Sequence, residues 1–578
     1  MIQVSDEYKK ASENTERKSY IIAKYGLYDK VGKTKINNVV ANFSQPFSNI
    51  YKTYNDVTET NYNYISCEPN RCKLDGSFYF LNSKTNSSEK EKIALWGNIL
   101  SDSNGNFSGD KPNLIFRFSE NLKLNNITLT FQEVVKSFRV DFYSNSTLVA
   151  SWETQNNNLL IVETNMVISN KYYNNITITF LATKEPYRYS KFNELDIGVL
   201  EKFGDEQIAD MQIIDEVSID SSELSSNSLT LQIKNLNGEF DILNPNNKLS
   251  KLQERQEIDI FHYLQVNGAY QEIPLGAFLI KKFTPRKQVL EIEAYDDTYY
   301  MNQMYYGSRF YENAEITFIL KDLFDYFDYT NYIIDEELEG IKLSGYVPNV
   351  EWREALRMIC EAGCCVVSKN RQGGTYIYRT YDEPIKTFSK KLLFSEEPSK
   401  NLFNNVIDVV EYNFTTRKEN EIIYSSELEI GTHTIIYNKY PILETTLEKN
   451  VENIDYEIIK AYATSCVVEV KQKTNVELKA TYIEETNSVI RKNKSVVNES
   501  EDFAISKIDN NLITIENSNL VANWKLNRSE IKFNFNTLVV PYVEVGDTCI
   551  YQTKYGDYRF IPTRIEFSNS ILQNIEGE

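Results

Sequence analysis

Residues 229–300 contain the clearest alternation of hydrophobic and polar positions in this chain. Leu229, Leu231 and Ile233 alternate with polar residues, which predicts a strand with one buried face. Asn237-Gly238 follows as a tight-turn signal. Further strands are expected at residues 258–260, 273–280 and 289–294. Short strands separated by turn residues predict a small antiparallel barrel or sandwich.

A second group of alternating segments lies between residues 62 and 185. The expected strands cover residues 74–81, 113–118, 127–131, 138–143 and 176–180. Together they predict a β-sandwich. The "LIFRF" and "NITLTF" strands, with Trp96 near a loop, resemble a discoidin-like jelly roll. The phrases "EPNRCKLDGSF" and "SDSNGNF" are similar to modules that precede the hub in tail proteins of Gram-positive phages.

The periodicity changes to helical spacing in residues 301–385. One helix is predicted by the apolar positions Ile316, Ile319, Leu320, Leu323, Phe324 and Phe327. A second helix is expected after Pro348, with Gly363 at its end. A hairpin should follow, with residues 371–374 as its charged, glycine-containing turn.

The two ends of the chain are less regular. Residues 1–61 are polar, and we expect an extended arm with a short helix near residues 6–13. Residues 386–578 return to β patterns, with "VEVGD" as a turn leading into a strand. Residues 448–462 are expected to contain a helix. We interpret 386–578 as a second barrel with an adjoining β domain.

A chain of 578 residues is too long for one core, and several domains are expected. The predicted fold class is mainly β and multidomain, with a sandwich, two small tube-type barrels and an α/β helix–hairpin insertion. The predicted domains are an N-terminal arm (1–61), a discoidin-like sandwich (62–185), a first barrel (186–300), an α/β insertion (301–385) and a second barrel with an adjoining β domain (386–578).

The order of these motifs resembles one protein family. "GEFDILNP", "IPLGAF" and "EIEAYDD", followed by "WREALRMICEAGCCVVSKNRQGGTYIY", are similar to the central hub proteins of bacteriophage tails and related contractile particles. The resemblance implies a structural, non-enzymatic baseplate protein that closes the distal end of a tail tube. It also implies a homotrimer, because three chains with two barrels each match a six-fold tube. The implied partners are distal tail or tail tube proteins, and a tape measure or spike protein.

Charge and hydropathy narrow the functional classes. The formal net charge of −20 argues against specific nucleic-acid binding, which needs Lys and Arg to contact phosphates. It suits a conduit for nucleic acid, and also a soluble protein kept apart by like charge. Residues 1–20 lack a secretion-signal pattern, and no apolar run has the length of a membrane span. We expect synthesis in a bacterial host cytoplasm and a final location at the virion tail tip.

Enzymatic motifs are scarce. The chain has two histidines, His262 and His433, so paired-His metal motifs are excluded. Its seven cysteines form neither a disulfide framework nor a CxxC pair, and small buried hydrophobes are the default interpretation. Carboxylate catalysis remains open in principle. The candidates are Asp296 with Asp297, and Asp335, Glu336 and Glu337, for which turn capping and solvation are the alternatives.

Two features of the predicted sandwich leave its role open. Residues 102–106 (DSNGN) have the alternating oxygens of a calcium loop but lack the glycine and distal glutamate positions of an EF-hand, so a polar turn is favoured. Trp96 could stack on a sugar or pack in a core. We therefore expect no catalytic, cofactor or metal residues. The alternatives to the hub are a carbohydrate-binding tail-tip adhesin that recognises a cell-surface glycan, and a cell-wall hydrolase.

Overall fold

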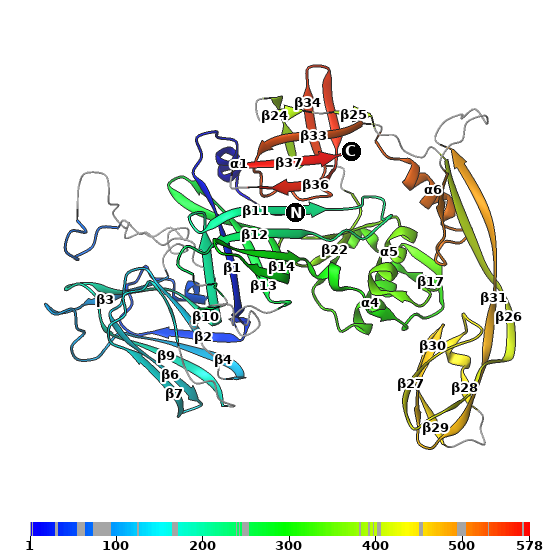
Figure 1. Cartoon of the computed structure of the whole chain (residues 1–578), viewed down its shortest axis with the longest axis horizontal. Helices are drawn as coiled ribbons and strands as arrows, with labels where there is room; N and C mark the ends of the chain where they lie inside the picture. The colour runs from blue at the N-terminus through cyan, green and yellow to red at the C-terminus, as the bar shows by residue number, and fades with distance from the viewer. Residues whose placement is uncertain are drawn as a thin grey trace.

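The computed structural model is mainly β and multidomain, with the sandwich at one end and a ribbon-borne domain at the other (Figure 1). Two barrels and the α/β insertion lie between these ends. The structure describes every residue other than 1, 3, 29–32, 55–63, 73–93, 124–126, 165–170, 239, 242, 245–253, 381–382, 391–392, 397, 401–405, 450–454, 494–504, 530 and 569–570. The strand expected at residues 74–81 lies outside the described part.

The sandwich has two sheets around one aromatic-rich core. One sheet contains β2 (Ile36–Ala41), β4 (Asn113–Lys123), β9 (Tyr172–Ala182), β6 (Ser137–Ser144) and β7 (Thr147–Thr154), in that order. The facing strands are β3 (Leu95–Leu100), β5 (Ile127–Phe131), β8 (Ile161–Glu163) and the first half of β10 (Tyr189–Gly204). Alternating residues of the first sheet are fully buried, among them Phe116 of β4, Phe138 of β6 and Phe180 of β9, as the sequence pattern requires.

The first barrel is built from strands of two distant parts of the chain. Its strands are the second half of β10, then β11 (Ile208–Glu216), β12 (Ser228–Lys234), β13 (Glu257–Val266), β14 (Ala269–Pro285) and β15 (Val289–Tyr295). β1 (Ser19–Tyr28) completes it by pairing with β10 on one side and β13 on the other. The barrel and the sandwich therefore share β10.

The N-terminal segment is not the extended arm that we expected. A short helix is present, α1 (Asp6–Ser12), but β1 lies inside the first barrel and β2 inside the sandwich. The reason is the alternation of Ile21, Ala23 and Tyr25, all buried, which gives β1 an apolar face for the barrel core. Tyr8 of α1 is also fully buried and meets Tyr542 of the second barrel edge to face.

The second barrel comes from the C-terminal third. Its strands are β23 (Lys386–Phe388), β24 (Leu393–Glu396), β25 (Ser399–Lys400), β33 (Ile531–Leu538), β34 (Cys549–Thr553), β35 (Gly556–Phe560), β36 (Pro562–Phe567) and β37 (Leu572–Gly577). β36 pairs with β11, so strands of both barrels belong to one 15-stranded sheet, while β23, β34 and β35 form a separate three-stranded sheet. A single buried apolar cluster runs through both barrels.

The insertion packs against the side of both barrels. Its helices are α4 (Ile316–Tyr326) and α5 (Trp352–Ala362), and its hairpin is β21 (Val366–Lys369) with β22 (Thr375–Tyr378). Its smaller elements are η3 (Asp297–Tyr300), β16 (Met304–Tyr305), β17 (Tyr311–Glu315), β18 (Tyr332–Ile334), η4 (Glu336–Leu338), β19 (Lys342–Gly345) and β20 (Val350–Glu351). α5 ends at Gly363, but Cys364 takes the left-handed conformation, with φ 51°.

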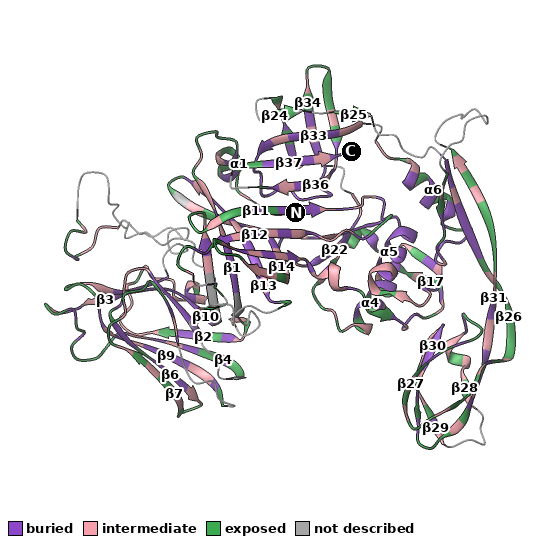
Figure 2. Ribbon diagram, viewed as in Figure 1, coloured by how far each residue is buried: buried purple, intermediate pink, exposed green. Residues whose placement is uncertain are grey.

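A long two-stranded ribbon leaves the insertion. β26 (Val406–Leu428) and β31 (Thr474–Asn493) form it, and β32 (Ile505–Ile508) and α6 (Ser518–Leu526) hold its base. The distal domain contains β27 (Gly431–Ile436), η6 (Glu444–Thr446), β28 (Glu448–Lys449), β29 (Tyr456–Ala461) and β30 (Ser465–Val470). The helix expected within residues 448–462 is wrong, because β28 and β29 occupy its described part. Figure 2 shows buried residues in the sandwich, the barrels and the insertion, and many exposed residues along the ribbon.

Candidate functional site

The two barrels meet along one seam, where β11 pairs with β36. Ile213 lies opposite Phe567 and Asp215 opposite Ile565, in antiparallel register. Ile213, Phe567 and Ile565 are fully buried, so the seam continues the apolar core as well as the hydrogen-bonded sheet. On the other face, Gln212 Nε2 donates to Glu566 Oε1 at 2.7 Å. The two barrels are thus joined by the same antiparallel strand pairing that joins neighbouring strands within each barrel.

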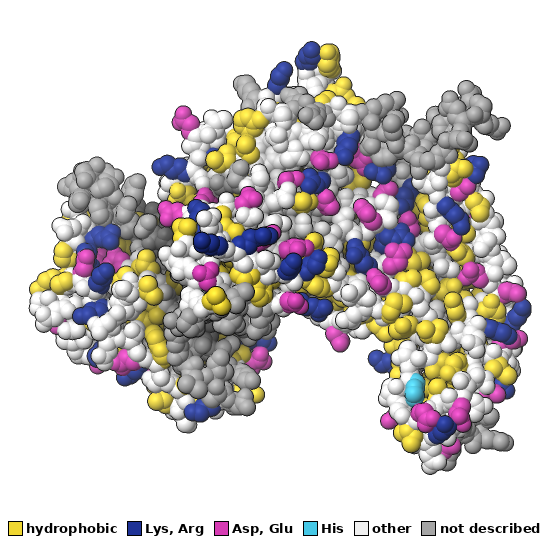
Figure 3. All heavy atoms as spheres, in the orientation of Figure 1, with side chains coloured by type: hydrophobic (Ala, Val, Ile, Leu, Met, Phe, Trp, Pro, Cys, Tyr) yellow, Lys and Arg dark blue, Asp and Glu magenta, His cyan; other side chains and the backbone are white. Residues whose placement is uncertain are grey.

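The outer face of the sheet at the seam is polar and acidic. Arg564 of β36 is the centre of this surface, with Nε 3.0 Å from Glu216 Oε1 and Nη2 2.8 Å from Glu566 Oε2. A third carboxylate, Glu576 Oε1, is 3.6 Å from Arg564 Nη1. Asn534, Asn536 and Asn574 continue the surface through amide hydrogen bonds. In the view of Figure 3, acidic and basic side chains are interspersed over the barrels.

The carboxylates considered for catalysis hold turns together. Asp296 caps η3, with its Oδ2 accepting from Asn227 N at 2.7 Å and its Oδ1 from Thr298 N at 3.0 Å. Burial raises the pKa of Asp296 to about 6. Asp297 Oδ1 is 2.6 Å from Lys369 Nζ in the insertion. These contacts give both carboxylates a structural role.

The second carboxylate group is also a cap. Asp335 Oδ1 accepts from Glu337 N at 2.9 Å, and its Oδ2 accepts from Tyr376 OH at 2.6 Å. Glu336 and Glu337 occupy the first turn of η4. This arrangement favours the capping interpretation over paired acid–base chemistry.

His262 and most cysteines are packing residues, whereas His433 is partly exposed. His262 is fully buried in β13, and His433 in β27 places Nε2 2.8 Å from Glu429 O. Five cysteines are buried, and burial raises the pKa of Cys364 to about 12. Cys67 and Cys72 are exposed, so the default interpretation fails for these two. Among the described residues, no group of three His, Cys, Asp or Glu is placed to hold a metal ion.

The turn at residues 102–106 and the Trp96 side chain both have structural roles in the sandwich. Asp102 Oδ1 accepts from Asn104 N at 2.8 Å and from Asn106 N at 2.9 Å, which is the geometry of a polar turn. Trp96 is 2% exposed and packs edge to face with Phe47, so its ring is not available to a sugar. Lys191 Nζ lies 4.5 Å from the centroid of that ring and 2.7 Å from Glu68 Oε2.

A small pocket lies beside this buried pair at the end of the sandwich. Its volume is about 270 Å³, and it is lined by Arg71, Glu133, Glu185, Arg188 and Tyr189 among others. Arg71 Nη2 is 2.6 Å from Glu133 Oε1, and Arg188 pairs with Glu185. The pocket combines charged hydrogen-bonding groups with one aromatic side chain.

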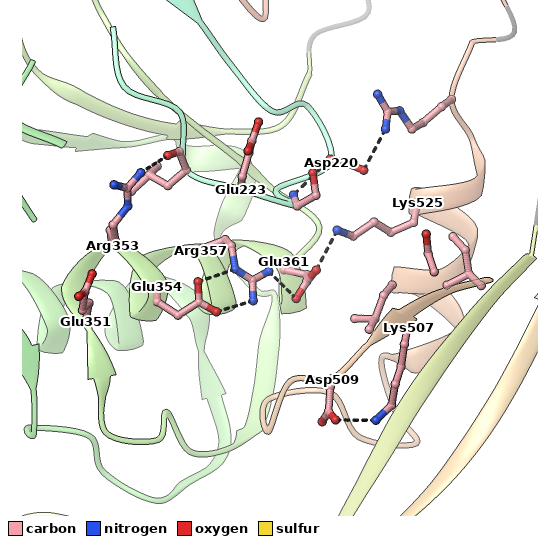
Figure 4. A pocket seen from close by; sticks show the side chains of 16 residues that line it. Asp220, Glu223, Glu351, Arg353, Glu354, Arg357, Glu361, Lys507, Asp509 and Lys525 are labelled. Atoms are coloured by element: carbon pink, nitrogen blue, oxygen red, sulfur yellow. Dashed lines mark hydrogen bonds and ion pairs between the residues drawn. The ribbon is translucent and has the colours of Figure 1, made fainter. Parts of the chain in front are cut away.

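A larger cleft of about 860 Å³ separates the insertion from the ribbon base (Figure 4). Arg357 of α5 is 2.8 Å from Glu354 Oε1 and 3.0 Å from Glu361 Oε2. Lys525 of α6 reaches Glu361 Oε1 at 2.8 Å, which completes an ion chain between the two helices. Sequence reasoning missed this chain, although Arg357 and Glu361 have the i,i+4 spacing of a helical pair.

The cations of the cleft are already partnered. Beyond the ion chain, Lys507 pairs with Asp509, Arg353 donates to Leu224 O, and Arg528 pairs with Asp220 and Glu578. The ion pairs around the cleft therefore hold the base of the ribbon against the insertion and the barrels. None of the described helices is long and apolar enough to cross a bilayer.

Comparison with known proteins gives structural similarities. No family model matches the chain, and no curated protein matches it. A 43 kDa tail protein of prophage MuSo2 from Shewanella oneidensis is similar at 10% identity, with 66% of this chain and 94% of that chain covered and a TM-score of 0.37. A prophage tail protein, gp18 from Listeria monocytogenes, is similar at 10% identity, with coverages of 64% and 94% and a TM-score of 0.32.

The sandwich has its own similarities. A fucose binding module from Streptococcus pneumoniae is similar at 11% identity, covering 30% of this chain and 95% of that chain, with a TM-score of 0.19. The matches agree with the tail-protein and discoidin-like resemblances expected from the sequence.

Proposed function

We propose that this protein is a structural hub at the distal end of a phage-type tail tube, assembled as a homotrimer. The observation that supports it is the edge-to-edge pairing of β11 with β36, which joins two barrels of one chain in a continuous sheet. Three such chains would supply six barrels. A ring of six matches a six-fold tube on one side, while three-fold symmetry faces the tip on the other.

The polar outer face of the seam suits a conduit. Three glutamates surround Arg564, and Glu576 also pairs with Lys532, so the cations on this outer face are neutralised and carboxylates outnumber them. Phosphates would meet a surface that holds no cluster of unpaired Lys or Arg among these residues, and they would pass without binding. The proposed partners are distal tail or tail tube proteins, together with a tape measure or spike protein. The role is structural and non-enzymatic.

Light scattering coupled to size-exclusion chromatography tests the assembly. The proposal predicts a particle of three times the 67.2 kDa chain mass, which binds a distal tail protein from the same genome. A matched variant, Ile213→Asp, places a charge in the seam and should abolish the trimer, whereas Thr230→Asp on the outer face of β12 should preserve it. A wild-type protein that stays monomeric and does not bind a tail protein would refute the proposed hub function.

A second candidate function is glycan binding by the sandwich, supported by the pocket around Arg71, Arg188 and Tyr189. Glycan arrays should use the full chain, because the sandwich shares β10 with the first barrel. Binding to a host-surface glycan that is lost in Tyr189→Ala would establish this role. Equal signals from wild type and variant, or no binding to any glycan, would remove it.

A further inference from the structure

The turn between β21 and β22 has a rigid, locally determined shape. Asn370 Oδ1 accepts from Gln372 N at 3.1 Å and from Gly374 N at 2.8 Å, so one side chain closes the turn. Gly373 has φ 87°, a conformation that glycine adopts without steric cost. The turn therefore presents Arg371 in a fixed direction, away from the insertion.

Arg371 inserts between the two barrels and contacts both. It is 3% exposed, and its Nε lies 3.1 Å from Asp215 Oδ2 of β11 in the first barrel. Its backbone N donates to Glu544 Oε1 at 3.0 Å, and its Nη1 donates to Pro541 O, both in the second barrel. The guanidinium lies 4.8 Å from the ring centroid of Phe567, at the seam itself.

Two glycines allow this close fit. A Cβ at Gly373 would come within 3.2 Å of Ala277 Cβ on β14 of the first barrel. A Cβ at Gly546 of the second barrel would overlap the hydroxyl of Tyr378, the last residue of β22. The hairpin thus lies close to one barrel on each side: a Cβ would be tight at Gly373 and would not fit at Gly546 without a shift of Tyr378.

The ion pair at the centre is not optimised for stability. Asp215 Oδ1 and Arg371 Nη2 are buried without a hydrogen-bond partner among the described residues. Buried ion pairs often contribute less to stability than apolar side chains of the same size, but they specify one arrangement, because breaking them leaves a charge unpaired. Such a pair is suited to fixing a relative position.

We propose that the 370–374 turn locks the two barrels in one relative orientation, and that Arg371 is the positioning residue. The guanidinium satisfies groups from both barrels at once only when β11 and β36 are in their observed register. The biological meaning of this lock rests on the proposed hub function, since a ring of six barrels needs one fixed angle between the two barrels of each chain. The geometric claim can be tested independently of assembly.

Hydrogen exchange read by mass spectrometry on the full chain tests the lock. Arg371→Met leaves Asp215 buried without its charged partner, and Arg371→Lys keeps a charge but loses the fork that serves several acceptors. We expect exchange in β11 and β36 to accelerate at least tenfold in Arg371→Met and less in Arg371→Lys, while β13 and β14 keep their protection. Arg353→Lys, an arginine of α5 that donates to Leu224 O, is the matched control and should change neither strand.

The outcomes separate the lock from the hub. Unchanged protection of β11 and β36 in both Arg371 variants would overturn the lock, whatever the oligomeric state. If Arg371→Met fails to fold, Arg371→Lys alone decides. If the wild type is monomeric but the seam loosens as expected in the variants, the hub fails and the lock remains. If the wild type forms trimers and the variants form trimers equally well with loosened seams, the lock does not serve ring formation.

Discussion

The buried carboxyl of Asp215 makes the seam respond to pH in a predictable direction. Burial raises the pKa of Asp215 from 3.8 to about 6; Arg371 opposes this shift and Glu544 adds to it. Because the folded pKa exceeds the unfolded one, the stability that Asp215 contributes is complete below pH 3.8 and is lost as pH rises through about 6. Acidification from pH 8 to pH 5 should therefore stabilise the seam by about 1.4 kcal/mol through this residue.

The perturbation is Asp215→Asn, which cannot titrate. The variant removes the charged partner of Arg371 above pH 6, and its pH dependence should be flatter by that same amount. The assay is the opening free energy of β11 amides from hydrogen exchange, corrected for the intrinsic pH dependence of exchange. Asp547, whose pKa burial also raises to about 6, still titrates in the variant and leaves a residual slope. Identical slopes in wild type and Asp215→Asn would refute the reasoning.

Three further predictions concern packing and ion pairs elsewhere. Gly345→Ala should destabilise the insertion by about 1–3 kcal/mol in chemical denaturation, because its Cβ would overlap Asn511 O. Gly340→Ala is the control, since Gly340 also has a positive φ but lies in open space. Equal losses of stability in the two variants would contradict the steric argument. Lys191→Met leaves Glu68 buried without its charged partner and should lower the stability of the sandwich by about 3–5 kcal/mol. Lys471→Met breaks an exposed ion pair and should lower stability by only about 0–1 kcal/mol. Similar melting temperatures for the two variants would contradict this prediction. Lys525→Met should weaken the attachment of α6 by about 1–3 kcal/mol, seen as faster hydrogen exchange there, while Lys507→Met should leave α6 unchanged.

Local patterns in the sequence predicted most elements near the candidate site. The alternation of Leu229, Leu231 and Ile233 corresponds to β12, and the helical spacing of Ile316 to Phe327 corresponds to α4. The same principle would have found β1, since Ile21, Ala23 and Tyr25 also alternate, but the many polar residues around them obscured it. The strands at 448–462 were mistaken for a helix because the segment is short and rich in charge.

The contacts between elements were beyond the sequence. Arg371 stood out only as part of a charged turn, since nothing local reveals that its partners are Asp215, more than 150 positions earlier, and Glu544, more than 170 later. The pairing of β11 with β36 depends on two sheet edges that meet only in the folded chain. Gly546 was recognised as a turn residue, whereas its contact with Tyr378 follows from tertiary packing.

Electron microscopy of the purified full-length protein, alone and on tail particles, tests the central claim most directly. The account predicts a three-fold particle in which six barrels, two from each chain, surround a lumen, with the β11–β36 seam within each chain intact. A protein that remains monomeric and is absent from tail tips, or a ring whose barrels do not come in pairs from each chain, would contradict it.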